Sequence, residues 1–359
     1  MRDGFIKVAA GTPKIRVADC RYNAEQIFTL MRQAAEQGVR VLVLPELCLT
    51  GYTCGDLFLQ DTLLRGALEG LATVLEATRN LDMLTALGLP VEIEGKLYNC
   101  AAVIHKGALL GLVPKQYLPN YGEFYEQRWF TSGGPGFSAR LDNLLGDGRP
   151  VVCARQIFVC DTLPELKVGV EICEDLWAPD PPCRELAQRG ATLMLNLSAS
   201  DEGVGKTQYR RQLVAGTSAR LVCGYLYANA GEGESTTDVV FPGHNMIAEN
   251  GVLLAERRFA SGLTVSEIDV QRLAYERRRI STFTTVPPAD GCPSVSFSLQ
   301  PATTTLTRHI APMPFVPEDQ GDRAERCNEI LYIAAQGLRK RLEHTGAKTA
   351  VVGLSGGLD

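Results

Sequence analysis

Short apolar segments alternate with amphipathic segments through the first three quarters of the chain, and this alternation most constrains its fold. Strands are expected at residues 5–10, 41–44, 83–89, 97–104, 108–113, 151–152, 167–172, 193–197, 225–229, 244–247 and 263–268. Helices are expected at residues 22–37, 63–79, 182–188 and 206–221. The pattern predicts an α/β fold in which helices cover the faces of sheets.

One apolar run ends on a thiol, in the segment VGVEICEDLW at residues 168–177. Cys173 is followed at once by Glu174 and Asp175, as acidic residues follow a helix start. A cysteine on such a turn can present its sulfur at the edge of a sheet, beside backbone N–H groups that stabilise an oxyanion. The alternative is a small buried side chain, the usual role of a free cysteine.

Two earlier apolar runs end on charged residues. Glu46 follows residues 41–45 and precedes more apolar residues, so we expect a buried carboxylate with a raised pKa that can take a proton from a thiol. Lys115 follows residues 109–114 in a fixed, extended segment, and a buried ammonium there would stabilise a thiolate and an oxyanion. Glu123 would orient this lysine. The alternatives are that Glu46 is a loop carboxylate, Lys115 a surface lysine and Glu123 a solvated loop charge.

The composition excludes several classes of partner. The net charge of −5 gives no reason to expect nucleic acid or an anionic membrane, and no apolar run is long enough to span a bilayer. Because the chain goes straight into a predicted strand, we expect no secretory signal at its start. Eleven cysteines without a C-x-x-C pair and four histidines without ligand spacing argue against disulfides, zinc and a catalytic metal. We therefore expect a cytoplasmic protein with reduced thiols and no bound metal.

The length of 359 residues favours one large domain and part of another. The predicted divisions are a catalytic domain at 1–275, a proline-rich linker or arm at 276–321 and the start of a second domain at 322–359. That last part is expected to hold a helix at 322–343, a strand at 350–354 and a glycine-rich turn. Because the chain stops inside a strand–loop unit, we expect a fragment of a longer protein.

Five sequence blocks, taken together, resemble the nitrilase, or carbon–nitrogen hydrolase, superfamily. Within it they are similar to the glutaminase domains of glutamine-dependent NAD(+) synthetases, over roughly residues 4–275. The blocks are PELCLTGY (45–52), KQYLPNYGEFYE (115–126), EICEDLW (171–177), NLSAS (196–200) and GEGESTTD (231–238). The resemblance implies a four-layer α-β-β-α sandwich, homo-oligomers and a Glu–Lys–Cys triad of Glu46, Lys115 and Cys173.

The same resemblance implies a reaction and a pocket. Glu46 would be the general base, Cys173 the nucleophile on the carboxamide of L-glutamine, and Lys115 with the N–H of Glu174 the oxyanion stabiliser. The implied pocket residues are Tyr52, Tyr121, Phe124, Glu174 and Ser200. No cofactor is implied for this reaction. The block at 231–238 is expected to couple to a second domain or to a subunit interface; the alternative is a flexible glycine loop.

The final residues, Ser355, Gly356, Gly357 and Asp359 with one leucine between, resemble the start of the pyrophosphate-binding loop of N-type ATP pyrophosphatases. This implies a C-terminal synthetase domain as partner, with ATP and Mg²⁺ bound there. Two alternatives stay open at this point. One is a stand-alone nitrilase-superfamily amidase acting on another carboxamide, and the other is a non-catalytic domain that has kept the fold.

Overall fold

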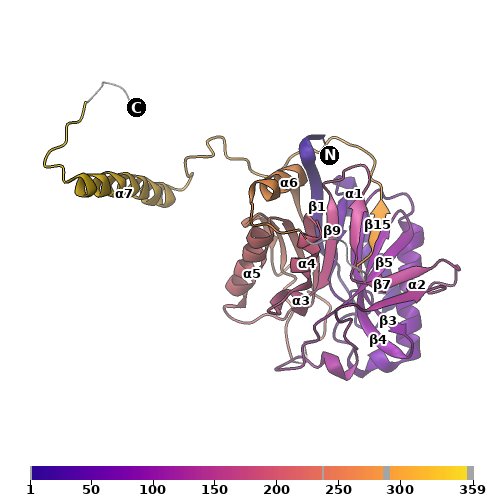
Figure 1. The fold of residues 1–359 in the computed structure, drawn as a ribbon. Coiled ribbons are helices and arrows are strands. Elements are labelled where there is room, and N and C mark those ends of the chain that lie inside the picture. Colours follow the sequence, from indigo (N-terminus) through magenta and orange to yellow (C-terminus); the bar gives the residue numbers. More distant parts are fainter. Residues whose placement is uncertain (1, 237, 286–291, 354–359) are drawn as a thin grey trace. The chain divides into compact units, whose positions relative to one another are not determined.

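The computed structural model describes residues 2–236, 238–285 and 292–353. Residues up to Thr307 form one unit, and the residues from Arg308 onward form another. The first unit confirms the α/β fold predicted from the alternation: it contains two mixed sheets with helices on their outer faces (Figure 1).

The eight-stranded sheet has the order β14-β1-β2-β3-β4-β5-β7-β6, in which β1, β2 and β3 run parallel. Its strands are β1 (Phe5–Thr12), β2 (Val41–Val43), β3 (Leu84–Ile93), β4 (Lys96–His105), β5 (Ala108–Pro114), β6 (Ser138–Leu141), β7 (Val151–Ala154) and β14 (Gly262–Asp269).

The seven-stranded sheet has the order β13-β12-β11-β10-β9-β8-β15, in which β9, β10 and β11 run parallel. Its strands are β8 (Ile157–Cys160), β9 (Lys167–Ile172), β10 (Leu193–Ser198), β11 (Gly224–Asn229), β12 (Asn245–Glu249), β13 (Val252–Arg257) and β15 (Ser294–Phe297).

The helices are α1 (Cys20–Glu36), α2 (Asp61–Ala77), α3 (Glu174–Trp177), α4 (Pro182–Gln188), α5 (Lys206–Leu221), α6 (Val270–Arg279) and α7 (Gln320–Thr345). One apolar core lies between the two sheets, and α1 and α2 form a second core with the outer face of the larger sheet. Helices α4 and α5 form a third core with the other sheet. The central strands are buried on both faces, which explains their continuous apolar runs.

The alternation along β1 shows how this layering arises. Ile6, Val8 and Ala10 belong to the core between the sheets, whereas Ala9 belongs to the core beneath α1 and α2. Successive side chains of a strand point to opposite faces, so one strand contributes to both cores. Because β2 and β5 run in the same direction, the segments that follow them meet at one edge of the sheet.

The first unit of the structure runs to Thr307, beyond the predicted boundary at residue 275. The segment expected as a linker contains the last turn of α6, residues 276–279, the edge strand β15, which pairs in parallel with β8, and a strap of residues 298–307. Prolines favour extended chain, and an edge strand accommodates it. Two contacts of the strap fasten it to the sheet: the Thr304 hydroxyl donates to Phe5 O at 2.9 Å, and the Gln300 N–H donates to Asp82 Oδ2 at 2.8 Å.

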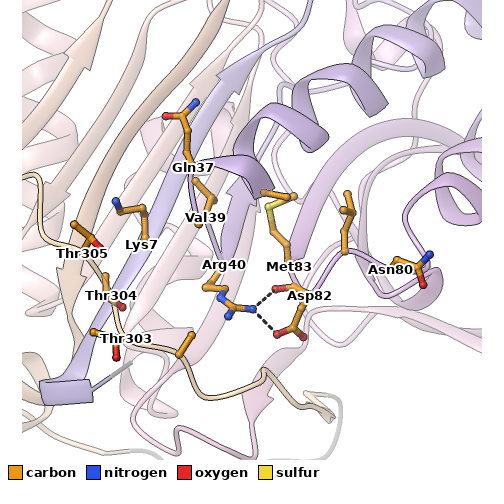
Figure 2. A pocket seen from close by; sticks show the side chains of 14 residues that line it. Lys7, Gln37, Val39, Arg40, Asn80, Asp82, Met83, Thr303, Thr304 and Thr305 are labelled. Atoms are coloured by element: carbon orange, nitrogen blue, oxygen red, sulfur yellow. Dashed lines mark hydrogen bonds and ion pairs between the residues drawn. The ribbon is translucent and has the colours of Figure 1, made fainter.

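The strap closes one side of a pocket of about 350 Å³ at the amino-terminal ends of β1, β2 and β3 (Figure 2). Arg40 forms an ion pair with Asp82 there, and Lys7 pairs with Glu267 at 3.2 Å. This pocket lies at the end of the strands away from Glu46, which follows the carboxyl end of β2. Its charged groups are paired and hold the sheet edge together.

The second unit consists of α7 and the residues that flank it. Asp319 caps the helix by accepting from the backbone N–H groups of Gly321 and Asp322 at 2.8 and 3.0 Å. The strand predicted at 350–354 is absent from its described part, residues 350–353, because an isolated segment has no partner for a hydrogen-bonded ladder. Ser355, Gly356, Gly357 and Asp359 lie outside the described residues.

Candidate active site

Three strand ends bring the predicted triad residues together. Glu46 follows β2, Lys115 follows β5 directly, and Cys173 follows β9 of the other sheet. All three are buried, with exposed fractions of 0%, 1% and 5%. The Lys115 Nζ donates to Glu46 Oε1 at 2.6 Å. A buried ammonium, a carboxylate and a thiol therefore share one end of the sandwich.

The backbone around Glu46 is held against the neighbouring strands. Asn99 in β4 donates from Nδ2 to Glu46 Oε1 at 2.6 Å, and its carbonyl accepts from the Lys115 N–H at 2.8 Å. Gly88 in β3 is required for this approach, since a Cβ there would lie 2.1 Å from the Leu47 backbone nitrogen. A larger residue at this position would push the Glu46 loop away from the sheet.

The carboxyl group that holds the Lys115 ammonium from the other side belongs to Glu126, not to the predicted Glu123. Glu126 Oε1 accepts from Lys115 Nζ at 2.6 Å and from the Tyr52 hydroxyl at 2.8 Å. Glu123 is exposed and lines a nearby cavity. Both glutamates follow the lysine within one block, and sequence spacing did not distinguish them. The Glu126 N–H bond to Pro119 O, at 3.1 Å, turns this residue inward.

Opposing effects set the charges in this cluster. Burial alone disfavours the Lys115 ammonium, but the Glu126 and Glu46 carboxyl groups outweigh it and raise the pKa of Lys115. Burial raises the pKa of Glu126 to about 8, while Lys115 acts in the opposite direction. The site therefore keeps a permanent cation next to Glu126, whose carboxyl group is largely protonated near neutral pH.

Cys173 occupies a strained backbone position at φ 45° and ψ −100°. L-residues rarely adopt such angles, and strain of this kind occurs most often at functional sites. The Cys173 N–H donates to Leu197 O in β10 at 2.8 Å, and its carbonyl accepts from the Leu176 N–H at 3.0 Å. The turn thus ends strand pairing and begins α3 within one residue.

Asp175 fastens this turn to the segment that follows Lys115, a role that no local sequence pattern indicated. Its Oδ2 accepts from the Ile172 N–H at 2.9 Å, and its Oδ1 accepts from the N–H groups of Gln116 and Tyr117 at 3.1 and 2.8 Å. Burial raises the pKa of Asp175 to about 7. One carboxyl group therefore holds the Cys173 turn against the segment that follows Lys115.

The Cys173 thiol is not ionised at rest. Burial and the Glu46 charge raise the pKa of Cys173, and Lys115 and the Ser198 hydroxyl only partly oppose them. A thiol in this state needs a base to become a nucleophile. Glu46 is the acidic group with the largest influence on it, which fits a proton transfer between the two.

The predicted pocket residues divide into two groups. Tyr52 and Phe124 line a cavity of about 240 Å³, together with Glu123. The Tyr121 hydroxyl donates to Glu174 Oε1 at 2.6 Å, and the Tyr121 and Phe124 rings meet edge to face at 6.2 Å. These side chains form a partly open rim, as the entrance to a polar substrate site requires.

Ser200, the remaining predicted pocket residue, is buried behind this rim. Its N–H donates to Asn229 Oδ1 at 2.8 Å, and its hydroxyl accepts from Arg210 at 3.3 Å. The structure therefore gives both groups protein partners. Lys206, which was not predicted, lies 5.8 Å from the ring centres of both Phe124 and Trp177 and supplies a cation to the rim.

The described part of the chain holds neither a metal site nor a helix able to span a membrane. In residues 2–236, 238–285 and 292–353, no group of three His, Cys, Asp or Glu side chains is arranged to hold a metal ion. None of the helices in this part of the chain combines the length and apolar character that crossing a membrane demands.

The fold and site define a hydrolase class in which a Glu–Lys–Cys cluster lies between two sheets. The carbon–nitrogen hydrolase model matches residues 7–278, and the chain belongs to this family. It is therefore a carbon–nitrogen hydrolase, and it is homologous to the glutaminase domain of NAD synthetases.

Among curated relatives, the glutamine-dependent NAD(+) synthetases of Mycobacterium leprae and Mycobacterium tuberculosis are 39% and 38% identical over 99% of this chain. The chain spans about half their length, 53% and 54%.

Solved structures agree on the fold. The crystal structure of a glutamine-dependent NAD(+) synthetase from Cytophaga hutchinsonii aligns with a TM-score of 0.62 at 31% identity, over 73% of this chain and 42% of that one. An amidase of the nitrilase superfamily from Nesterenkonia aligns with a TM-score of 0.59 at 21% identity, over 78% of this chain and 99% of that one. The second likeness bears on the fold alone.

Proposed function

We propose that this chain hydrolyses L-glutamine to glutamate and ammonia through a thioester on Cys173. The observation that carries the proposal is the buried Lys115 ammonium shared between Glu46 and Glu126. In this arrangement Glu46 supplies a fixed base and Lys115 a fixed positive charge beside a strained cysteine turn. Glutamine is favoured over other carboxamides because the relatives at 38–39% identity are glutamine-dependent enzymes.

In the first half-reaction, Glu46 takes the proton of the Cys173 thiol and the sulfur attacks the side-chain carboxamide carbon of glutamine. A C–S bond forms, and the carbonyl oxygen becomes an oxyanion that Lys115 and the Glu174 N–H stabilise. The C–N bond then breaks, the nitrogen takes the proton back from Glu46, and ammonia leaves. Lys115 suits this role because its pKa is raised, so its charge persists through the reaction.

In the second half-reaction, Glu46 takes a proton from water and the resulting hydroxide attacks the thioester carbon. The C–S bond breaks, and the sulfur regains a proton from Glu46 as glutamate leaves. Splitting amide hydrolysis in this way replaces one difficult attack by two easier ones. Tyr121 and Glu174 lie at the rim, where a carboxylate can accept a hydrogen bond from the α-ammonium group of glutamine.

The ammonia would serve an ATP-dependent amidation of deamido-NAD to NAD in a longer protein. This extension rests on the relatives, of which the chain spans about half. The synthetase domain, its ATP and Mg²⁺ and the homo-oligomer are part of the same proposal.

The test is mass spectrometry after treatment with a glutamine-mimicking diazo-ketone, with and without excess L-glutamine. We expect one adduct on Cys173, prevented by glutamine and absent from Cys173→Ala. Cys327 is exposed and provides an internal measure of unspecific labelling. An adduct that another carboxamide prevents and glutamine does not would make the chain an amidase of different specificity. No adduct on Cys173 would refute the proposed nucleophile.

A further inference from the structure

The loop of residues 231–238 is fastened to the segment that carries Tyr52. Glu234 Oε1 accepts from the Tyr52 N–H at 2.8 Å. Its Oε2 accepts from the Thr53 N–H at 3.0 Å and from the Thr53 hydroxyl at 2.6 Å. The Thr53 Oγ1 in turn accepts from the Ser235 N–H at 2.8 Å. Four hydrogen bonds thus join segments about 180 residues apart in the sequence.

Each of the two joined segments contains a glycine that packs closely against residues 15–17. Gly233 has φ 109°, and a Cβ there would lie 2.0 Å from Ile15 O. Gly51 has φ 88°, and a Cβ there would lie 3.3 Å from the Val17 Cα. A side chain at either position would be strained, so both glycines are suited to the backbone that this contact requires.

The side chain of Tyr52 continues from this contact into the catalytic cluster. Its hydroxyl donates to Glu126 Oε1 at 2.8 Å, and the same oxygen accepts from Lys115 Nζ at 2.6 Å. Tyr52 also packs edge to face on Phe241, with ring centres 5.9 Å apart. The direction of the phenol therefore depends on where the Tyr52 backbone is held, and Glu234 holds it.

Holding the loop with the Glu234 carboxylate costs free energy, because this group has no counter-ion in the described part of the chain. All of its hydrogen-bond donors are neutral, and no cation of the described residues lies within ion-pair distance. Burial raises its pKa, as expected for a carboxylate without a counter-ion. Its two oxygens, however, receive three donors at once, which a neutral amide with one acceptor oxygen does not.

We propose that Glu234 is a positioning residue of this active site. By fixing the backbone of Tyr52, it keeps the phenol hydroxyl on Glu126. That carboxyl group in turn holds the Lys115 ammonium where Glu46 also binds it. The inference depends on the proposed function only for the reaction that the site performs.

The rate at which iodoacetamide alkylates Cys173, followed by peptide mass spectrometry, tests the proposal on the full chain. Glu234→Gln should slow alkylation roughly 10-fold, because small displacements of catalytic groups cost one to two orders of magnitude. Glu234→Asp, which keeps the charge, should recover part of the rate. The matched control is Glu232→Gln, an exposed glutamate in the same loop, which should alkylate like the wild type.

A double-mutant cycle with Tyr52→Phe separates positioning from general stability. If Glu234 acts through the Tyr52 hydroxyl, Glu234→Gln slows alkylation little further once that hydroxyl is gone. Slowing factors that multiply would overturn the proposal, as would a Glu234→Gln rate within twofold of the wild type. If Glu234→Gln does not fold, Thr53→Val takes its place in the cycle, with the same two outcomes.

This assay does not need glutamine turnover. A wild-type chain that alkylates at Cys173 but never hydrolyses glutamine would refute the proposed function, and it would leave the test of Glu234 intact.

Discussion

Replacing Glu126 by glutamine tests the charge state of the cluster around Lys115. Glu126 is 1% exposed, and burial raises its pKa to about 8. Its contacts fit the protonated form, because Oε1 receives both Lys115 and Tyr52 while Oε2 has no hydrogen-bond partner among the described residues and can carry the proton. A neutral amide is then a close substitute for this group near pH 6.

The magnitude follows from the pKa difference between the folded and unfolded states. An unfolded glutamate ionises near 4.5 and Glu126 ionises near 8, so the folded state holds one more proton between these values. The stabilising contribution of this group is complete below pH 4.5 and is lost as pH rises through 8, at about 1.4 kcal/mol per pH unit. Glu126→Gln removes that loss. From pH 6 to pH 8, its free energy of unfolding should rise relative to the wild type by about 2 kcal/mol.

Urea unfolding measured by tryptophan fluorescence at pH 6, 7 and 8 gives this difference, since both tryptophans, Trp129 and Trp177, lie in the first unit. Glu123→Gln is the matched control: it changes an exposed carboxylate of the same segment and should follow the wild type at every pH. A Glu126→Gln variant that is less stable than the wild type by a constant amount across the range would show that Glu126 is ionised throughout. That result would refute the reasoning.

Two further substitutions test how the site is held. Asp175→Asn leaves one acceptor oxygen for three backbone N–H groups; it should lower the free energy of unfolding by about 1–3 kcal/mol and reduce glutamine hydrolysis. Thermal unfolding and an ammonia assay measure both, and a loss below about 0.5 kcal/mol would contradict the role assigned to this carboxyl group. Gly88→Ala should abolish hydrolysis by displacing the Glu46 loop. Gly134→Ala, where a Cβ would be 3.8 Å from its nearest neighbour, should not, and equal activity of the two variants would argue against the close approach.

The sequence predicted the parts of the fold that bury continuous apolar runs. The strands at the middle of both sheets and the helices α4 and α5 lie where the pattern placed them, because buried strands and amphipathic helices have distinct periods. It missed the short strands β6 and β8, the half-exposed strand β13 and the edge strand β15. Helix α6 was also missed, since it ends in three arginines and buries only two residues. Short or half-exposed elements depend on pairing partners that local pattern does not reveal.

The residues of the candidate site were likewise predicted only in part from the sequence. Strand ends were visible in the sequence, so Glu46, Lys115 and Cys173 were named from it. The choice of Glu126 over Glu123 depends on how a loop folds back, and both residues have the same chemistry. Asp175 was read as an acidic residue at a helix start, whereas its carboxyl group accepts hydrogen bonds from a segment about 60 residues away. No local sequence pattern predicts a hydrogen bond between segments so far apart.

Buried and half-buried carboxyl groups join the segments of this site, and each joins parts of the chain that are distant in sequence. Asp175 connects the cysteine turn to the lysine segment, Glu126 connects that segment to Tyr52, and Glu234 connects Tyr52 to the loop at 231–238. Burial raises the pKa of all three, so each carries an energetic cost in the folded protein. Hydrophobic contacts would join the same segments at lower cost but with less directional control. The arrangement is therefore better explained by the geometry that the Lys115 ammonium needs than by stability, and the variants at these three positions should impair chemistry more than they impair folding.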